Sequence, residues 1–203
     1  MAARRRRLLV TAVAIVLVAA LGVWWLVLGP GGGDPAPSAP QPQRRELSLD
    51  QLPNPTDRAL STSGVLTVDQ AQLESVIKPD EAAYLSRNGV QRIYYRGVNA
   101  RSVGYQLFAF STASAENART LAANIASRGK QLGMSDTQVA GVPAPIRVTK
   151  VVSDNAAIFE AVYASGDAVV RIVVGQTDQV DEQLITTALK HSIDVVTEFI
   201  GPN

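Results

Sequence analysis

An uninterrupted apolar run near the start of the chain constrains its fold most strongly. Residues 8–28 form 21 consecutive positions without a charged side chain. At about 1.5 Å of rise per residue, a helix of this length extends roughly 30 Å, which matches the hydrocarbon thickness of a bilayer. The run therefore predicts a single transmembrane helix over 8–28, with residues 1–7 as a short basic segment before it.

The flanking residues give this expected helix a direction. Arg4, Arg5, Arg6 and Arg7 precede the run, and a stretch rich in glycine and proline follows it. Because positive charge stays on the cytoplasmic side, we expect a cytoplasmic N-terminus and an extracytoplasmic C-terminal part in the cell envelope. The alternative is a cleaved signal peptide, whose apolar region is normally shorter and ends in small residues. Bulky Trp24 and Trp25 occupy that end here, which favours an uncleaved signal anchor.

Residues 29–63 have the composition of a flexible tether. They hold seven of the 11 prolines of the chain, and residues 31–33 are all glycine. Such a segment buries too little apolar surface to fold by itself. Leu47, Leu49 and Leu52 are the side chains in it that could pack where the tether meets a domain over 64–203.

Short β-like runs alternate with helical patterns in residues 64–203. The pattern predicts strands at 64–68, 91–96, 102–110, 146–152, 157–163 and 168–175, and helices at 69–77, 80–85, 113–131 and 179–200. Asp69 and Asp178 are the expected caps of the first and last helices. We predict an α+β domain with a mixed or antiparallel sheet of about five or six strands and helices mainly on one face. The order strand, turn, strand, helix occurs twice, which suggests a ββα repeat.

Composition excludes several classes of chemistry. The chain has no cysteine, so disulfides, zinc–thiolate sites and thiol nucleophiles are absent. From Gly64 onward there are 12 Lys and Arg against 14 Asp and Glu. A basic face is the usual footprint of a nucleic-acid partner, and this balance gives no reason to expect one. We also expect no cofactor.

One pair of short motifs resembles a serine hydrolase signature. Ser75 and Lys78 form an SxxK pattern, and residues 153–155 read SDN, in the order found in penicillin-binding proteins. That chemistry needs the serine at the start of a helix, whereas Asp69 as cap places Ser75 late in its helix. No KTG follows, so we interpret both motifs as chance.

The single histidine, His191, has only Asp194 nearby at helical spacing. Metal sites generally recruit several ligands. We therefore predict no catalytic, cofactor-binding or metal-binding residue.

A small basic and aromatic group on the predicted hairpin is the candidate ligand or partner patch. It consists of Arg92, Tyr94, Arg96 and Arg101. Such a surface could receive an anionic ligand, for example a lipid headgroup or a wall polymer. The alternative is a solvated sheet face whose charges discourage edge pairing.

The layout resembles that of actinobacterial exported domains. The resemblance lies in the basic start, the apolar run, the tether, the run FAFS at 108–111 leading into AENA at 115–118, and VAGVP at 139–143. Such proteins include membrane-anchored domains of unknown function and the extracytoplasmic sensor domains of serine/threonine kinases. This sequence differs in lacking cysteines, which those sensor domains often pair, and we expect no kinase domain before the anchor.

These observations favour a non-enzymatic, membrane-anchored envelope protein whose outer domain binds a ligand or a partner protein. Two alternatives stay open. The chain could be an accessory subunit of a membrane transport or secretion complex, or an envelope hydrolase of unrecognised type.

Overall fold

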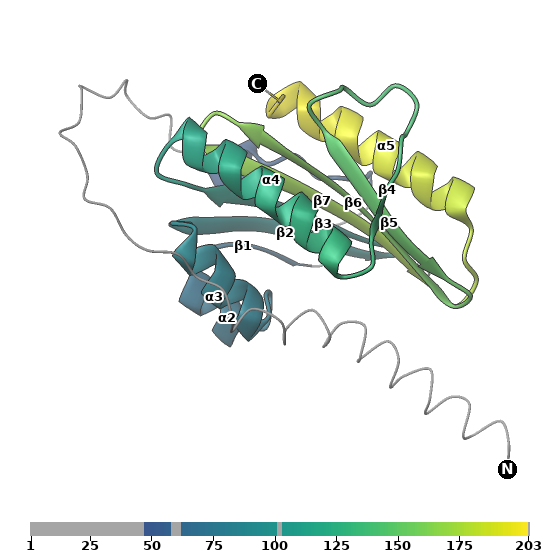
Figure 1. Cartoon of the computed structure of the whole chain (residues 1–203), viewed down its shortest axis with the longest axis horizontal. Coiled ribbons are helices and arrows are strands. Elements are labelled where there is room, and N and C mark those ends of the chain that lie inside the picture. The colour runs from purple at the N-terminus through teal and green to yellow at the C-terminus, as the bar shows by residue number, and fades with distance from the viewer. Residues whose placement is uncertain (1–46, 58–61, 101–102, 203) are drawn as a thin grey trace, which may run out of the picture.

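A computed structural model of the chain describes residues 47–57, 62–100 and 103–202. Within these residues, an α+β domain is built from seven strands, four α-helices and one 3-10 helix (Figure 1). In chain order the elements are η2 (Leu49–Gln51), β1 (Thr62–Leu66), α2 (Val68–Leu73), α3 (Pro79–Arg87), β2 (Arg92–Ala100), β3 (Val103–Ser111), α4 (Ala115–Gln131), β4 (Ser135–Asp136), β5 (Arg147–Ser153), β6 (Ala156–Ser165), β7 (Ala168–Thr177) and α5 (Glu182–Phe199). The predicted α+β class is confirmed.

The described strands form one sheet in the order β1-β2-β3-β7-β6-β5-β4. Every neighbouring pair is antiparallel, so the sheet is not mixed. The strand that the sequence did not predict is β4, which pairs with β5 through only Ser135 and Asp136. Two residues are too short to produce an alternating pattern.

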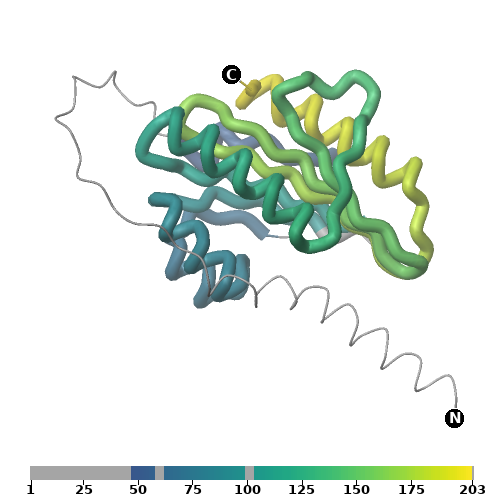
Figure 2. The backbone as a smooth tube through the Cα atoms, viewed as in Figure 1, coloured from purple at the N-terminus to yellow at the C-terminus, as the bar shows by residue number. Residues whose placement is uncertain are grey.

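Helices cover both faces of the sheet (Figure 2). Helices α2, α3 and α4 contribute to a core with Phe108, Phe110 and Val162, and we call this side the α4 face. Helix α5 packs on the other side with Phe159 and Ile172, which we call the α5 face. The expectation of helices mainly on one face holds for α2, α3 and α4, and α5 is the exception. The reason is that β6 and β7 are apolar on both faces, as strands buried on both sides are.

The predicted ββα repeat is present in element order but not in space. Helix α4 follows the β2–β3 hairpin and α5 follows the β6–β7 hairpin. Within this sheet, the first hairpin is superposed on the second by a two-fold rotation about an axis perpendicular to the sheet. Such a rotation does not exchange the two faces of the sheet. Because α4 and α5 lie on opposite faces, that rotation does not carry α4 onto α5.

Residues 47–57, which we call the strap, belong to the folded domain and not to a flexible tether. Leu52 is 1% exposed within the α5-face core. The Arg96 guanidinium donates to the Leu49 carbonyl at 2.8 Å, and the Ser192 hydroxyl donates to the Pro55 carbonyl at 2.7 Å. The expected boundary at residue 64 is thus too late. The strap holds the short helix η2, and the expected packing of Leu47, Leu49 and Leu52 against the domain is confirmed.

Two predicted helix caps are also corrected. Helix α2 begins after Thr67, whose hydroxyl accepts from the Gln70 amide at 3.2 Å while the Gln70 side chain accepts from the Thr67 amide at 2.9 Å. This reciprocal capping box displaces Asp69 into the first turn. Helix α5 is capped by Asp181, whose carboxylate accepts two backbone amides. Asp178 instead has φ +78 in the preceding turn.

No helix in the described part of the chain is long and apolar enough to cross a membrane. The predicted basic segment 1–7, anchor 8–28 and tether residues 29–46 lie outside the described residues.

Candidate functional site

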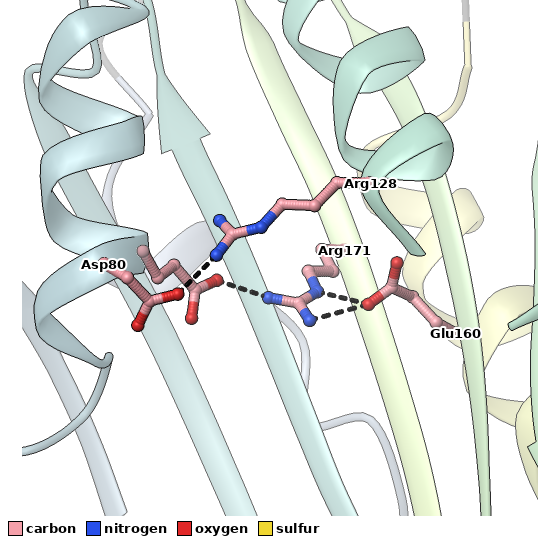
Figure 3. Close-up of polar contacts among 5 residues, drawn as sticks. Asp80, Arg128, Glu160 and Arg171 are labelled. Carbon is pink, nitrogen blue, oxygen red and sulfur yellow. Dashed lines mark hydrogen bonds and ion pairs between the residues drawn. The ribbon is translucent and has the colours of Figure 1, made fainter. Parts of the chain in front are cut away.

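Five charged side chains meet on the α4 face, between α3, α4 and the sheet (Figure 3). Arg171 of β7 lies at the centre. Its Nε and Nη2 contact one Glu160 carboxylate oxygen at 2.7 and 2.6 Å, and its Nη1 contacts Glu81 of α3 at 2.6 Å. Arg128 of α4 contacts Asp80 at 2.5 Å. We call these five residues the ion-pair cluster.

The cluster is largely shielded from water. The Glu160 side chain is 5% exposed and the Arg171 side chain is 23% exposed. Burial disfavours the Arg171 charge, but Glu160 and Glu81 outweigh burial and raise the pKa of Arg171 above its ordinary value. The guanidinium carbon of Arg171 also lies 5.9 Å from the Phe108 ring centroid. Arg171 therefore stays charged and fixed in place.

Tyr84 of α3 lies beside the cluster. The Arg128 guanidinium carbon is 5.1 Å from the Tyr84 ring centroid, within the range of a cation–π contact. Burial raises the pKa of Tyr84 to about 12, although the Arg128 charge opposes the shift. Together, the cation–π contact and the Arg128–Asp80 ion pair join α3 to α4, while the Arg171–Glu81 ion pair joins α3 to the sheet. We interpret the cluster as structural, because each of its three carboxylates contacts one of its two guanidinium groups.

Beyond the cluster, the described helices leave part of the α4 face of the sheet uncovered. Six residues in two rows across β3, β7, β6 and β5 form this area, which we call the open patch: Gly104, Gln106, Val151, Ile158, Val173 and Gly175. Gln106 and Ile158 are exposed and the other four are half-buried. None of the six carries a charge.

The C-terminal turn of α4 marks the border of the open patch. A Cβ at Gly129 would lie 3.6 Å from the Thr149 hydroxyl, so α4 ends over that row of the sheet. Thr149 is 2% exposed, whereas Val151, two residues further along β5, is half-buried. In the described part of the chain, the helical cover of the α4 face thus ends at the row of Thr149, which continues across the sheet to Val173 and Gln106 of the open patch.

The predicted patch is not gathered on an exposed surface. Arg92 is exposed, but Tyr94 is 2% exposed in the α5-face core. Arg96 is half-buried and bound to the strap. Arg101 lies outside the described residues. Where sequence reasoning placed a ligand surface, the chain uses Arg96 to hold its own strap.

The serine and histidine motifs do not assemble catalytic sites. Ser75 has φ +58 in the turn after α2 rather than a place at the start of a helix. Lys78 precedes α3 as its N-cap residue. The His191 Nε2 lies 3.8 Å from Asp57, and both side chains are substantially exposed. Among the described residues, no group of three or more His, Cys, Asp or Glu could hold a metal ion.

An open depression of about 290 Å³ lies where α3 ends and α4 begins. Arg87, Asn88, Gly89, Asn117 and Thr120 line it. The Asn88 amide is already engaged, because it donates to the Tyr84 carbonyl at 2.9 Å. Ligand sites usually enclose most of their ligand, and a shallow polar surface of this kind does not.

Sequence reasoning missed both the ion-pair cluster and the open patch, although each leaves a signal. Glu160 and Arg171 are isolated charges of opposite sign in the two strands of one apolar hairpin. Such charges are rarely buried unless they are paired. Gly104 and Gly175 interrupt β-like runs, which marks a bulge or a close approach.

Comparison with known proteins gives little further guidance. No family model matches the chain, and no curated protein is similar to it. One solved structure with a related outline is the extracellular domain of PknH from Mycobacterium tuberculosis. It is 12% identical, the match covers 69% of this chain and 81% of that one, and the TM-score is 0.42. Overlap at this level carries no functional argument.

Proposed function

We propose that this protein is anchored in a cell membrane and that its extracytoplasmic domain binds a partner without catalysis, through the open patch. The open patch carries this proposal. Helices and the strap pack on much of both faces of the sheet, and an uncharged sheet area that they leave open is suited to contact with another molecule.

Two further observations support the proposal. The 21 apolar residues at 8–28 have the length and flanking charge of a signal anchor. The charged cluster nearest the open patch is internally paired, so it offers no free acid, base or nucleophile. Of the envelope components considered from the sequence, the lack of charge in the patch favours a protein over an anionic headgroup or wall polymer.

Site-specific photo-crosslinking in living cells tests this function. A photoreactive residue replaces Gln106 in the full chain, and a matched control places it at Asn124, which is exposed on α4. We expect a crosslinked adduct from Gln106 and little or none from Asn124. Equal adducts from both positions, or none from either, would contradict binding through the patch.

A phosphatase fused after Asn203 tests the orientation separately. The fusion should be active, because the enzyme folds only outside the cytoplasm. An inactive fusion made at normal levels would contradict an extracytoplasmic domain.

A further inference from the structure

The strap is the first described segment after the predicted anchor. Residues 29–46 separate the apolar run at 8–28 from Leu47, where the strap begins. In a domain that is anchored at one end and held by a partner at the open patch, any pull between the membrane and the partner enters the fold through the strap. The next element on this path is β1, which pairs with β2 along its whole length.

Side chains, rather than strand pairing, hold the strap against the α5 face. None of the described strand pairs includes a strap residue. Leu52 is buried in the α5-face core. The Leu49 carbonyl accepts a hydrogen bond from Arg96 of β2, and the Pro55 carbonyl accepts one from Ser192 of α5. A pull from the N-terminal end loads these contacts one after another, and segments held in this way open locally before the whole fold does.

The bound strap leaves one charged group incompletely satisfied. Arg96 Nη2 donates to the Leu49 carbonyl at 2.8 Å, but Nε of the same guanidinium is buried without a hydrogen-bond partner among the described residues. A buried polar atom without a partner costs free energy, because it has lost its bond to water. Detachment of the strap offsets part of its own cost, since it gives this guanidinium access to water.

We propose that the strap is a load-sensitive latch, which a pull between the membrane anchor and the bound open patch detaches while the sheet and its helices stay folded. This inference rests on the proposed function and adds a mechanical response to it. Detachment frees Arg96, whose neighbours on the same face of β2 are Arg92 and Tyr94. The response to load thus appears at the basic and aromatic group that the sequence singles out.

Single-molecule force measurement on the full chain in detergent micelles tests the latch. The chain has no cysteine, so Gln43→Cys and Gln106→Cys provide two attachment points, one before the strap and one in the open patch. Two matched variants each remove one hydroxyl from α5. Ser192→Ala removes the bond to the Pro55 carbonyl, whereas Thr197→Ala removes bonds inside the helix itself.

We expect the chain to extend in at least two steps as the force rises. The first step should add no more than the contour of residues 44–61, about 60 Å at about 3.4 Å per residue. Ser192→Ala should raise the rate of this step at a given force about fivefold, the effect of one hydrogen bond, and Thr197→Ala should leave it unchanged. A later step of unchanged size in each variant shows that the domain still folds.

A first step longer than the contour of residues 44–61 would overturn the latch, because β1 would then open together with the strap. An equal response to Ser192→Ala and Thr197→Ala would overturn it as well, since the first step would not depend on the strap contact. Neither result concerns patch binding or orientation, which the Gln106 crosslink and the phosphatase fusion test separately.

Discussion

Removing the central cation of the ion-pair cluster should destabilise the domain strongly. The Arg171→Met change keeps most of the side-chain volume but leaves Glu160, which is 5% exposed, and Glu81 without their counter-charge. Breaking a buried pair on one side costs about 3–5 kcal/mol. Because the Arg171 side chain is 23% exposed and water can reach the site, we expect the lower end, about 3 kcal/mol.

Urea unfolding of the chain from residue 47 onward, which contains both cores, measures this loss. The Lys190→Met change is a matched control, since Lys190 forms an exposed i,i+4 ion pair with Asp194. It should cost at most about 0.5 kcal/mol. A double-mutant cycle with Glu160→Leu isolates the pair, because the double variant buries neither charge of the Arg171–Glu160 contact. We expect the two single losses to exceed the double loss by about 1.5 kcal/mol or more. Additive losses, or an Arg171→Met loss no larger than that of Lys190→Met, would refute a structural role for the cluster.

Three other changes test the fold. Leu52→Ala should lower the free energy of unfolding by about 3 kcal/mol because the strap is part of the core. A loss below about 0.5 kcal/mol would contradict that and indicate that the strap is part of the tether. Between pH 10 and about 12 the free energy of unfolding should fall, since the unfolded state loses the Tyr84 proton first. Tyr84→Phe should reduce that slope without abolishing it, because burial also raises the pKa of Tyr163; an unchanged slope would contradict the assignment. Ser75→Gly should stabilise the domain by about 0.5–1 kcal/mol, since Ser75 adopts φ +58, and a clear loss in melting temperature would show that its side chain is needed there.

The fold class was predictable because its signals are local. The alternating and continuous apolar runs that became β2, β3, β5, β6 and β7 are visible in the sequence, as are the helical patterns of α4 and α5. The expectations that the structure corrects concern packing between segments far apart in the sequence. The strap was assigned to the tether because of Pro53 and Pro55, although its leucines were expected to pack near the domain; the burial of Leu52 against α5-face residues shows that the strap is part of the core.

The site was predicted less well, for a related reason. Arg92, Tyr94 and Arg96 share one face of β2, which alternation shows correctly, but alternation does not tell whether that face meets solvent or another segment. The open patch gathers residues from four strands with different sequence separations. Its existence depends on where α4 ends over the sheet, which no single segment encodes.

The central claim is that the open patch is covered by a partner in the cell, and cysteine footprinting measures that coverage most directly. The chain has no cysteine, so single Gln106→Cys and Asn124→Cys variants report one position each when treated with a membrane-impermeant maleimide. The account predicts that intact cells label Asn124→Cys as fast as the purified protein is labelled, but label Gln106→Cys several-fold more slowly. Equal labelling of Gln106→Cys in cells and in the purified protein would contradict it.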